Sequence, residues 1–510
     1  MDNYDYKQES KNYVRHRALS NAICSLTSER QQACCVSRNY VRQVIDYFLE
    51  MDTDEPARKE VEEIQSSYCS SWESLHDSII GYKRPSDLTV CYLSGPQPEN
   101  DFTELTNLGV LPQNIWAFES DKSTYLKAID TYNSNTAVFP QPKIVKMSIE
   151  QFFKHSPKKF DIVYIDACGA ITSAKHALRA VATLLYHQRL NSPGVLITNF
   201  AKPDINKDDI KVEFSQMIAL YMVFKEYPNC RITMDGCNLN IEFYNKILQD
   251  VLLMFDDYYG RFITYILSDL ASIIIPLQRF GEIAPYSNLF TQEEVEATKT
   301  TFDIDSLNSI NNNSVCKWIL MLDWKLHRKQ SGVKSNTLCK DLIGIDGKWD
   351  QLIRGISFFI ALRKESHCTK NCISSKGDVF KDIHELYQFL DRPSASLFID
   401  VIINQLAYPL HSNAEKSRSY QYCAKNTDMF TDLLVFDECR YIYEWLPAIH
   451  QIENAMRNKS WQYIFRFALD GLVKQRINYN NEFFFQGSVI TKNEIGFGAK
   501  KRKIRERIGD

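Results

Sequence analysis

The sequence is poor in glycine and proline and lacks several common catalytic motifs. Glycine accounts for 18 and proline for 16 of the 510 residues, so the chain is neither collagen-like nor low in complexity. The patterns GxxxxGK(S/T), GxSxG and HExxH do not occur. Their absence argues against P-loop nucleotidases, α/β-hydrolases and zincin metalloproteases.

The chain also lacks an excess of charge, a secretory signal and a long hydrophobic run. Lys and Arg number 60 against 63 Asp and Glu, and the net charge of -3 creates no general attraction to polyanions. The first 17 residues contain no apolar stretch of the kind a signal peptide needs. The longest apolar run, 262–277, contains Asp269 and is shorter than the roughly 20 residues that cross a bilayer. We therefore predict a buried helix there, no membrane partner, and a cytoplasmic protein with 14 reduced cysteines.

A regular alternation of strands and helices begins near residue 86. Short runs rich in Val, Ile, Leu and aromatic residues alternate with amphipathic helical segments, as is typical of parallel strands covered on both faces. The runs are LTVCYL (88–93), NIWAFE (114–119), KIVKM (143–147), FDIVYID (160–166) and GVLITNF (194–200). The pattern predicts an open, doubly wound, mostly parallel α/β sheet. Two further runs are candidates for its last strands, 231–234 and 238–243.

The length predicts two to four domains, at about 100–200 residues each. Residues 1–85 have helical spacing and form a predicted N-terminal extension, and 86–245 hold the α/β domain. Residues 246–313 are a helical connection that ends in an Asn- and Ser-rich linker. Residues 314–510 are predicted to form a mainly helical C-terminal domain with a basic tail.

Ligands bind at the carboxyl ends of the strands in sheets of this kind, near the switch in strand order. Gly95 follows the first predicted strand, where it allows a tight turn and a close approach to a ligand. Glu119 ends the second strand, 24 residues after Gly95, and is placed to bind the hydroxyls of a ribose. Asp166 ends the fourth strand. These three residues are therefore candidates for one site.

The segments YLSGP, IWAFESD, KMSIEQFF, FDIVYIDACG and PGVLITNF occur in this order between 86 and 245. The set resembles the motif series of class I S-adenosylmethionine-dependent methyltransferases. This resemblance implies S-adenosylmethionine as the cofactor, and cofactor contacts from Ser94, Gly95, Glu119, Ser148, Ile149 and Asp166.

The resemblance also implies a role for each part of the pocket. Gly95 would lie against the methionine moiety, and Glu119 would hold the ribose hydroxyls. Ser148 and Ile149 would flank the adenine, while Asp166 would face the methyl group or the acceptor as a catalytic residue. The first function hypothesis is therefore a methyltransferase.

The sequence also departs from the family pattern. Only Gly95 remains of the two or three glycines usual in the first motif, which favours the alternative of an inactive scaffold or binding protein. Cys168 resembles part of the turn of RNA cytosine-5 methyltransferases, but the proline of that turn is missing. Asp166 has the alternative role of capping the next helix.

Charge and aromatic residues suggest partners outside this site. The tail 500–507 carries six basic residues and suits contacts with a nucleic acid, or else it only aids solubility. The segment 411–428 mixes Lys, Arg and Tyr and is either a nucleic-acid-binding loop or an ordinary surface loop. The C-terminal domain could also bind a protein partner. No four-ligand zinc pattern accompanies His367, Cys368 and Cys372, so no metal site is predicted.

Overall fold

The computed structural model describes most of the chain. The described residues are 9–51, 55–134, 143–167, 169–171, 175–226, 241–287, 290, 292–297, 315–320, 348–367, 404–448, 451–468 and 502–509. The strands are β1 (Val90–Leu93), β2 (Ile115–Phe118), β3 (Lys143–Val145), β4 (Phe160–Asp166), β5 (Leu190–Ala201), β6 (His411–Ser412), β7 (Arg418–Ala424), β8 (Thr427–Asp437) and β9 (Glu506–Ile508).

Helices surround these strands in the first half of the chain. They are α1 (Glu9–Leu26), α2 (Arg30–Ala33), α3 (Tyr40–Met51), α4 (Glu55–Ile80), α5 (Glu99–Asn107), α6 (Lys122–Ser134), α7 (Ile149–His155), α8 (Lys175–Tyr186), α9 (Asp208–Glu226) and α10 (Ile241–Leu253). Further along the chain lie α11 (Phe255–Asp269), α12 (Ile275–Ile283), α13 (Gln292–Ala297), α17 (Trp349–His367), α20 (Arg440–Tyr443) and α21 (Ile452–Met456).

One mixed sheet runs through the molecule in the order β3-β2-β1-β4-β5-β8-β7-β9, with β6 paired to β8. Strands β1 to β5 are parallel, which confirms the five predicted strands and the mostly parallel α/β fold. The strand order switches between β1 and β4, because β1 lies between β2 and β4. A doubly wound sheet offers its ligand crevice at this point.

The part of the sheet beyond β5 differs from the sequence prediction. Residues 241–243, predicted as strand, lie in helix α10, and the strands beside β5 come instead from 411–437. Strand β8 pairs antiparallel with β5, and β7 pairs antiparallel with β8. The prediction of a surface loop over 411–428 is therefore wrong. The described part of 314–510 contributes four strands to the same sheet as 86–201, in addition to helices.

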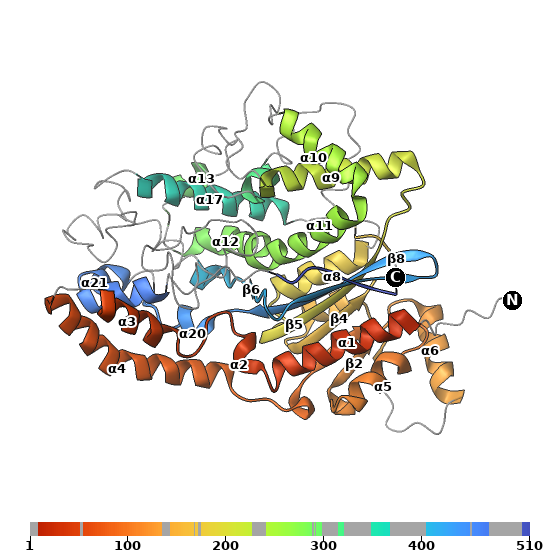
Figure 1. Cartoon of the computed structure of the whole chain (residues 1–510), viewed down its shortest axis with the longest axis horizontal. Coiled ribbons are helices and arrows are strands. Elements are labelled where there is room, and N and C mark those ends of the chain that lie inside the picture. Colours follow the sequence, from red (N-terminus) through yellow and green to blue (C-terminus); the bar gives the residue numbers. More distant parts are fainter. Residues whose placement is uncertain are drawn as a thin grey trace.

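Helices cover both faces of this sheet (Figure 1). Helix α1 presents Val14, Leu19 and Ile23 to one face, where they join a buried cluster with residues of the central strands. Helices α8, α11 and α12 cover the opposite face, in a larger cluster that also holds α3 and α4. Burial of both faces explains why these strands contain long apolar runs instead of an alternating pattern.

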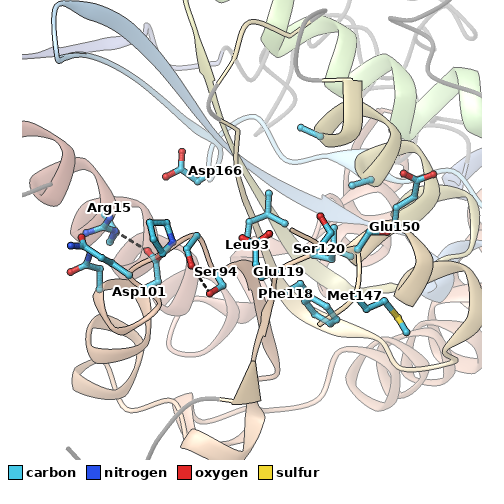
Figure 2. A pocket seen from close by; sticks show the side chains of 18 of the residues that line it. Arg15, Leu93, Ser94, Asp101, Phe118, Glu119, Ser120, Met147, Glu150 and Asp166 are labelled. Carbon is cyan, nitrogen blue, oxygen red and sulfur yellow. Dashed lines mark hydrogen bonds and ion pairs between the residues drawn. The ribbon is translucent and has the colours of Figure 1, made fainter. Parts of the chain in front are cut away.

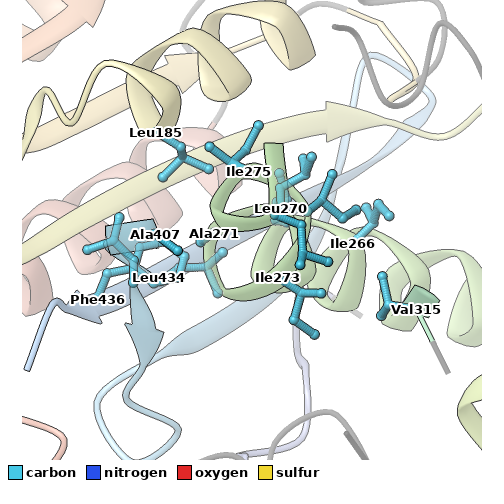
Figure 3. Packing of buried hydrophobic residues seen from close by; sticks show 14 of the residues in the cluster. Leu185, Ile266, Leu270, Ala271, Ile273, Ile275, Val315, Ala407, Leu434 and Phe436 are labelled. Carbon is cyan, nitrogen blue, oxygen red and sulfur yellow. The ribbon is translucent and has the colours of Figure 1, made fainter. Parts of the chain in front are cut away.

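The predicted buried helix over 262–277 is confirmed as part of α11 and α12, joined by a π-helical turn, Leu270–Ile274 (Figure 3). Its Asp269 is fully buried and forms an ion pair of 2.8 Å with Lys225. Within the described residues one helix, Phe255–Tyr286, is apolar and long enough to cross a membrane. However, 83% of its most apolar window is buried inside the protein, as expected for a core helix.

Candidate cofactor-binding site

A pocket of about 320 Å³ opens at the carboxyl ends of β1, β2 and β4, next to the switch in strand order (Figure 2). All six residues predicted from the sequence line it: Ser94, Gly95, Glu119, Ser148, Ile149 and Asp166. The same pocket is also lined by Lys11, Arg15, Leu93, Pro96, Gln97, Asn100, Asp101, Phe118, Ser120, Met147, Glu150, Ala177 and Ala180. Its volume is within the range of small-molecule sites.

The loop after β1 forms one wall of the pocket. The Ser94 backbone N–H donates to the Phe118 carbonyl at 2.9 Å, which ties this loop to the end of β2. Gly95 has a φ of +59°, a left-handed conformation that favours glycine. A Cβ at this position would meet no atom within 4 Å, so the space beside Gly95 is open to a ligand.

Glu119 follows β2 and is held by its backbone, since its N–H donates to the Val145 carbonyl at 3.1 Å. One carboxylate oxygen, Oε1, accepts a hydrogen bond of 2.8 Å from the Asp121 backbone N–H. No described residue donates to Oε2. The half-buried carboxylate can therefore accept further hydrogen bonds from hydroxyl groups in the pocket.

The loop between β3 and α7 forms another wall. Ser148 is the N-cap of α7, where its Oγ accepts a hydrogen bond of 3.1 Å from the Gln151 N–H. Ile149 is buried, and the neighbouring Met147 is more exposed. Both Ser148 and Ile149 line the pocket, and the Ser148 hydroxyl is already engaged in capping α7.

Asp166 is held by two side chains at the end of β4. Its Oδ2 forms an ion pair of 2.9 Å with the Lys11 ammonium, and its Oδ1 accepts a hydrogen bond of 2.8 Å from the Asn199 side chain. The alternative role of helix cap is wrong, because α8 begins only at Lys175 and the carboxylate contacts Lys11 and Asn199. Cys168 lies outside the described residues.

Helix α1 supplies two basic residues to the pocket that the sequence analysis missed. Lys11 and Arg15 are one helical turn apart, and Arg15 forms an ion pair of 2.8 Å with Asp101 of α5. Burial raises the pKa of Asp101 to about 6, although Arg15 opposes this shift. Burial lowers the pKa of Lys11, but the Asp166 carboxylate outweighs it and the net pKa is raised, so Lys11 stays protonated.

A buried polar network continues from Asp166 into the sheet. The Asn199 amide donates to the Tyr422 hydroxyl at 3.0 Å as well as to Asp166. Its Oδ1 accepts a hydrogen bond of 2.9 Å from Thr431. Burial raises the pKa of Tyr422, so its hydroxyl is neutral. Residues from β5, β7 and β8 thus fix the orientation of the Asn199 amide and, through it, of Asp166.

The basic tail is partly held in the sheet, although Lys503 and Arg507 in it are exposed. Strand β9 pairs with β7, and the Arg505 guanidinium contacts both oxygens of the buried Asp432 at 3.0 Å. Arg502 is half-buried, and burial of its guanidinium lowers its pKa to about 9. Gly260 of α11 permits the approach of Arg505, since a Cβ there would lie 2.8 Å from Nε.

The sheet order and the pocket define a doubly wound α/β protein with a pocket at the switch point, where proteins of this class bind their ligands. No family model matches the chain. No curated protein sequence matches it either.

Parts of several solved methyltransferases resemble part of this chain. A protein from Haemophilus influenzae described as a methylase has 15% identity over 23% of this chain and 71% of its own, with a TM-score of 0.19. An S-adenosylmethionine-dependent methyltransferase from Clostridium acetobutylicum has 12% identity over 29% and 58%, with a TM-score of 0.18. Magnesium protoporphyrin IX methyltransferase from Synechocystis, solved with S-adenosylmethionine, has 15% identity over 34% and 84%, with a TM-score of 0.18. Similarity at these TM-scores carries no weight by itself.

Proposed function

We propose that this chain is an S-adenosylmethionine-dependent methyltransferase. The observation that supports the proposal best is the convergence of the six motif residues, separated by up to 72 positions, on one pocket at the switch point of the sheet. Two features of the pocket fit the cofactor: the open space beside Gly95 and the Glu119 oxygen that accepts no hydrogen bond from the described residues.

In this proposal the walls of the pocket bind the cofactor at three points. The loop at Ser94 and Gly95 holds the methionine end, and Glu119 accepts hydrogen bonds from the ribose hydroxyls. Ile149 packs against the adenine. When bound, S-adenosylmethionine supplies an electrophilic methyl group. The protein's contribution is then to position the acceptor in line with that group, which can account for much of a rate enhancement.

Asp166 and Lys11 are the groups that would orient the acceptor. Lys11 is protonated and acts as a hydrogen-bond donor and positive charge, so it does not serve as the base. The Asp166 carboxylate is the acceptor of hydrogen bonds at the same place, and it would orient or deprotonate the nucleophile. The pair therefore suits a nucleophile that carries a proton, such as a hydroxyl or an amine.

Calorimetry with S-adenosylmethionine and S-adenosylhomocysteine tests the cofactor assignment. Glu119→Ala removes hydrogen bonds to a charged group worth about 1.5–3 kcal/mol, so we expect the Kd to rise by roughly tenfold to a hundredfold. Glu62→Ala, on the exposed face of α4 and away from the pocket, is the matched control and should leave the Kd unchanged. Absence of binding to the wild type, or equal Kd values for both variants, would contradict the assignment.

The second candidate is a scaffold that keeps the fold without transferring methyl groups. The observation in its favour is the single glycine, Gly95, in the loop after β1, where a methyltransferase usually has more. Incubation of the wild type with labelled S-adenosylmethionine and separate pools of RNA, DNA, protein and small molecules distinguishes the two. Cofactor binding without transfer to any pool would favour the scaffold, and transfer to one pool would also identify the acceptor class.

A further inference from the structure

Two cysteines that are 404 positions apart in the sequence meet beside a carboxylate at the opposite end of β5 from the pocket. Cys35 lies between α2 and α3, and Asp437 and Cys439 lie at the end of β8. All three side chains are buried, and one possible ligand atom from each lies within 4.8 Å of the others. We propose that Cys35, Asp437 and Cys439 bind a thiophilic divalent cation of the Zn²⁺ class.

The distance between two of the proposed ligand atoms fits a tetrahedral cation. Zinc lies about 2.3 Å from a thiolate sulfur and about 2.0 Å from a carboxylate oxygen, so two such ligands of one ion are about 3.5 Å apart. The Cys439 Sγ and the Asp437 Oδ2 are 3.5 Å apart. In the absence of a cation the thiol donates a hydrogen bond to this oxygen, and the cation would take the place of the thiol proton.

The surroundings of Asp437 resemble those of a metal-ligating carboxylate. Its Oδ2 accepts hydrogen bonds from the Cys35 backbone N–H at 2.8 Å and from the Tyr441 hydroxyl at 2.6 Å. Its Oδ1 accepts from Ser192 Oγ at 3.0 Å and from the Cys439 N–H at 2.9 Å. Such hydrogen bonds fix the orientation of a ligand before the cation arrives.

Two independent observations also point to a bound cation at this cluster. His76 is fully buried, and no described residue forms a hydrogen bond with its Nδ1. Its ring centroid lies 4.4 Å from that of Tyr441, whose hydroxyl donates to the Asp437 carboxylate. Cys439 has a φ of 50°, a strained conformation for a non-glycine residue that is concentrated at functional sites.

The charges of the proposed site and its surroundings also balance. A divalent cation displaces one proton from each thiol, and the resulting site of two thiolates, one carboxylate and one cation has a net charge of -1. The buried Arg30 guanidinium interacts electrostatically with Asp437 and offsets this charge.

The test uses the full chain, purified with a phosphine reductant and without added metal. Elemental analysis should find about one Zn²⁺ per chain, and Co²⁺ added to the stripped protein should give thiolate-to-cobalt charge-transfer absorption. Cys35→Ser and Cys439→Ser should lose both signals. Cys69→Ser and Cys91→Ser, which remove buried thiols outside the cluster, should keep both.

The wild type alone provides a second measurement, so that poor folding of a variant does not affect the test. Zn²⁺ added to the stripped protein in weak buffer should release two protons per cation. A wild type that binds no Zn²⁺ and gives no cobalt–thiolate band would overturn the proposal. So would equal binding by Cys35→Ser and Cys69→Ser, or a disulfide between Cys35 and Cys439 in place of metal binding.

Discussion

Asp166 is the residue on which the proposed transfer step depends. The ion pair to Lys11 and the hydrogen bond from Asn199 place it rigidly at the pocket wall, at the end of a fully buried strand. Interactions made mainly with the reacting group affect transfer and leave cofactor binding largely unchanged. Substitution of Asp166 should therefore affect methyl transfer, whereas substitution of Glu119 should affect cofactor binding.

We expect Asp166→Ala to abolish methyl transfer while the Kd for S-adenosylmethionine changes by less than about threefold, as the acceptor contact is lost but the cofactor walls remain. Lys11→Met should reduce transfer strongly for the same reason. Single-turnover rates and calorimetry on the same preparations provide both quantities. A stable, fully active Asp166→Ala would exclude the catalytic role.

Asp101 should make stability depend on pH in an unusual direction. Its pKa is raised from 3.8 to about 6 by burial, so the folded state binds more protons than the unfolded state between these values. The free energy of unfolding should therefore fall as the pH rises from 4 to 7, by about 2.4 kcal/mol from this group. Asp101→Asn removes the contribution, so urea unfolding of both proteins across this range isolates it. Parallel curves would contradict the prediction.

At the scale of elements, β9 links the C-terminus to the helix that supplies Lys11. It pairs with β7, and its Glu506 forms an ion pair with Arg17 of α1. Two residues of α1 also contact β7: Ser10 Oγ donates to the Cys423 carbonyl at 3.3 Å, and Asn21 donates to the Tyr420 hydroxyl at 2.9 Å. The last strand thus supports the helix that forms one side of the pocket.

Two arginines of this segment provide a matched pair of variants. Arg505→Met leaves the fully buried Asp432 without its guanidinium, which should cost about 3–5 kcal/mol of the free energy of unfolding. Arg507→Met removes an ion pair with Asp257 in which both side chains are more than half exposed, and it should cost less than about 1 kcal/mol. Urea unfolding measures both.

Equal losses for the two arginine variants would contradict the buried position of Arg505. The pair also bears on the nucleic-acid hypothesis for the tail. If the tail binds phosphates, Arg507→Met should reduce the salt dependence of binding in a folded protein, because its side chain is accessible.

Local patterns predicted the central elements but not the elements that complete the sheet. Strands β1 to β5 were predictable because buried apolar runs alternate with helices. Strand β7 was not, because Ser419 and Gln421 are polar yet buried, and nothing in their neighbourhood reveals that distant segments cover them. The opposite error occurred at 241–243, where a short run with strand-like residues continues into helix α10.

The residues of the site also divide into those that local patterns predict and those that they do not. The six motif residues were predictable because the carboxyl ends of neighbouring parallel strands must lie together. Lys11 and Arg15 lie one helical turn apart on α1, but their pairing with Asp166 and Asp101 depends on how α1 packs on the sheet. That packing involves residues more than 80 positions away, which a local pattern does not encode.

At the scale of the molecule, 86–245 should not fold as an independent domain, although the sequence pattern predicts one there. Strand β5 pairs with β8 from Gly194 to Ala201, so the fragment lacks the partner of a long, buried, apolar strand. An open edge of this kind promotes aggregation. We expect the fragment to aggregate on expression and the full chain to give a monodisperse peak in gel filtration. A folded, monomeric fragment with a cooperative unfolding transition would contradict this.

The position of β8 also affects the order of events during synthesis. Between the end of β5 and the start of β8 lie 225 residues, and a ribosome adding about 5–20 residues per second needs roughly 10–45 seconds to make them. For that time the nascent chain carries β1 to β5 with one apolar edge open, and β9 emerges later still. Translation speed through 202–426 therefore sets how long chaperones must shield this edge, and synonymous codons that slow that stretch would lower the yield of native protein without changing a single residue.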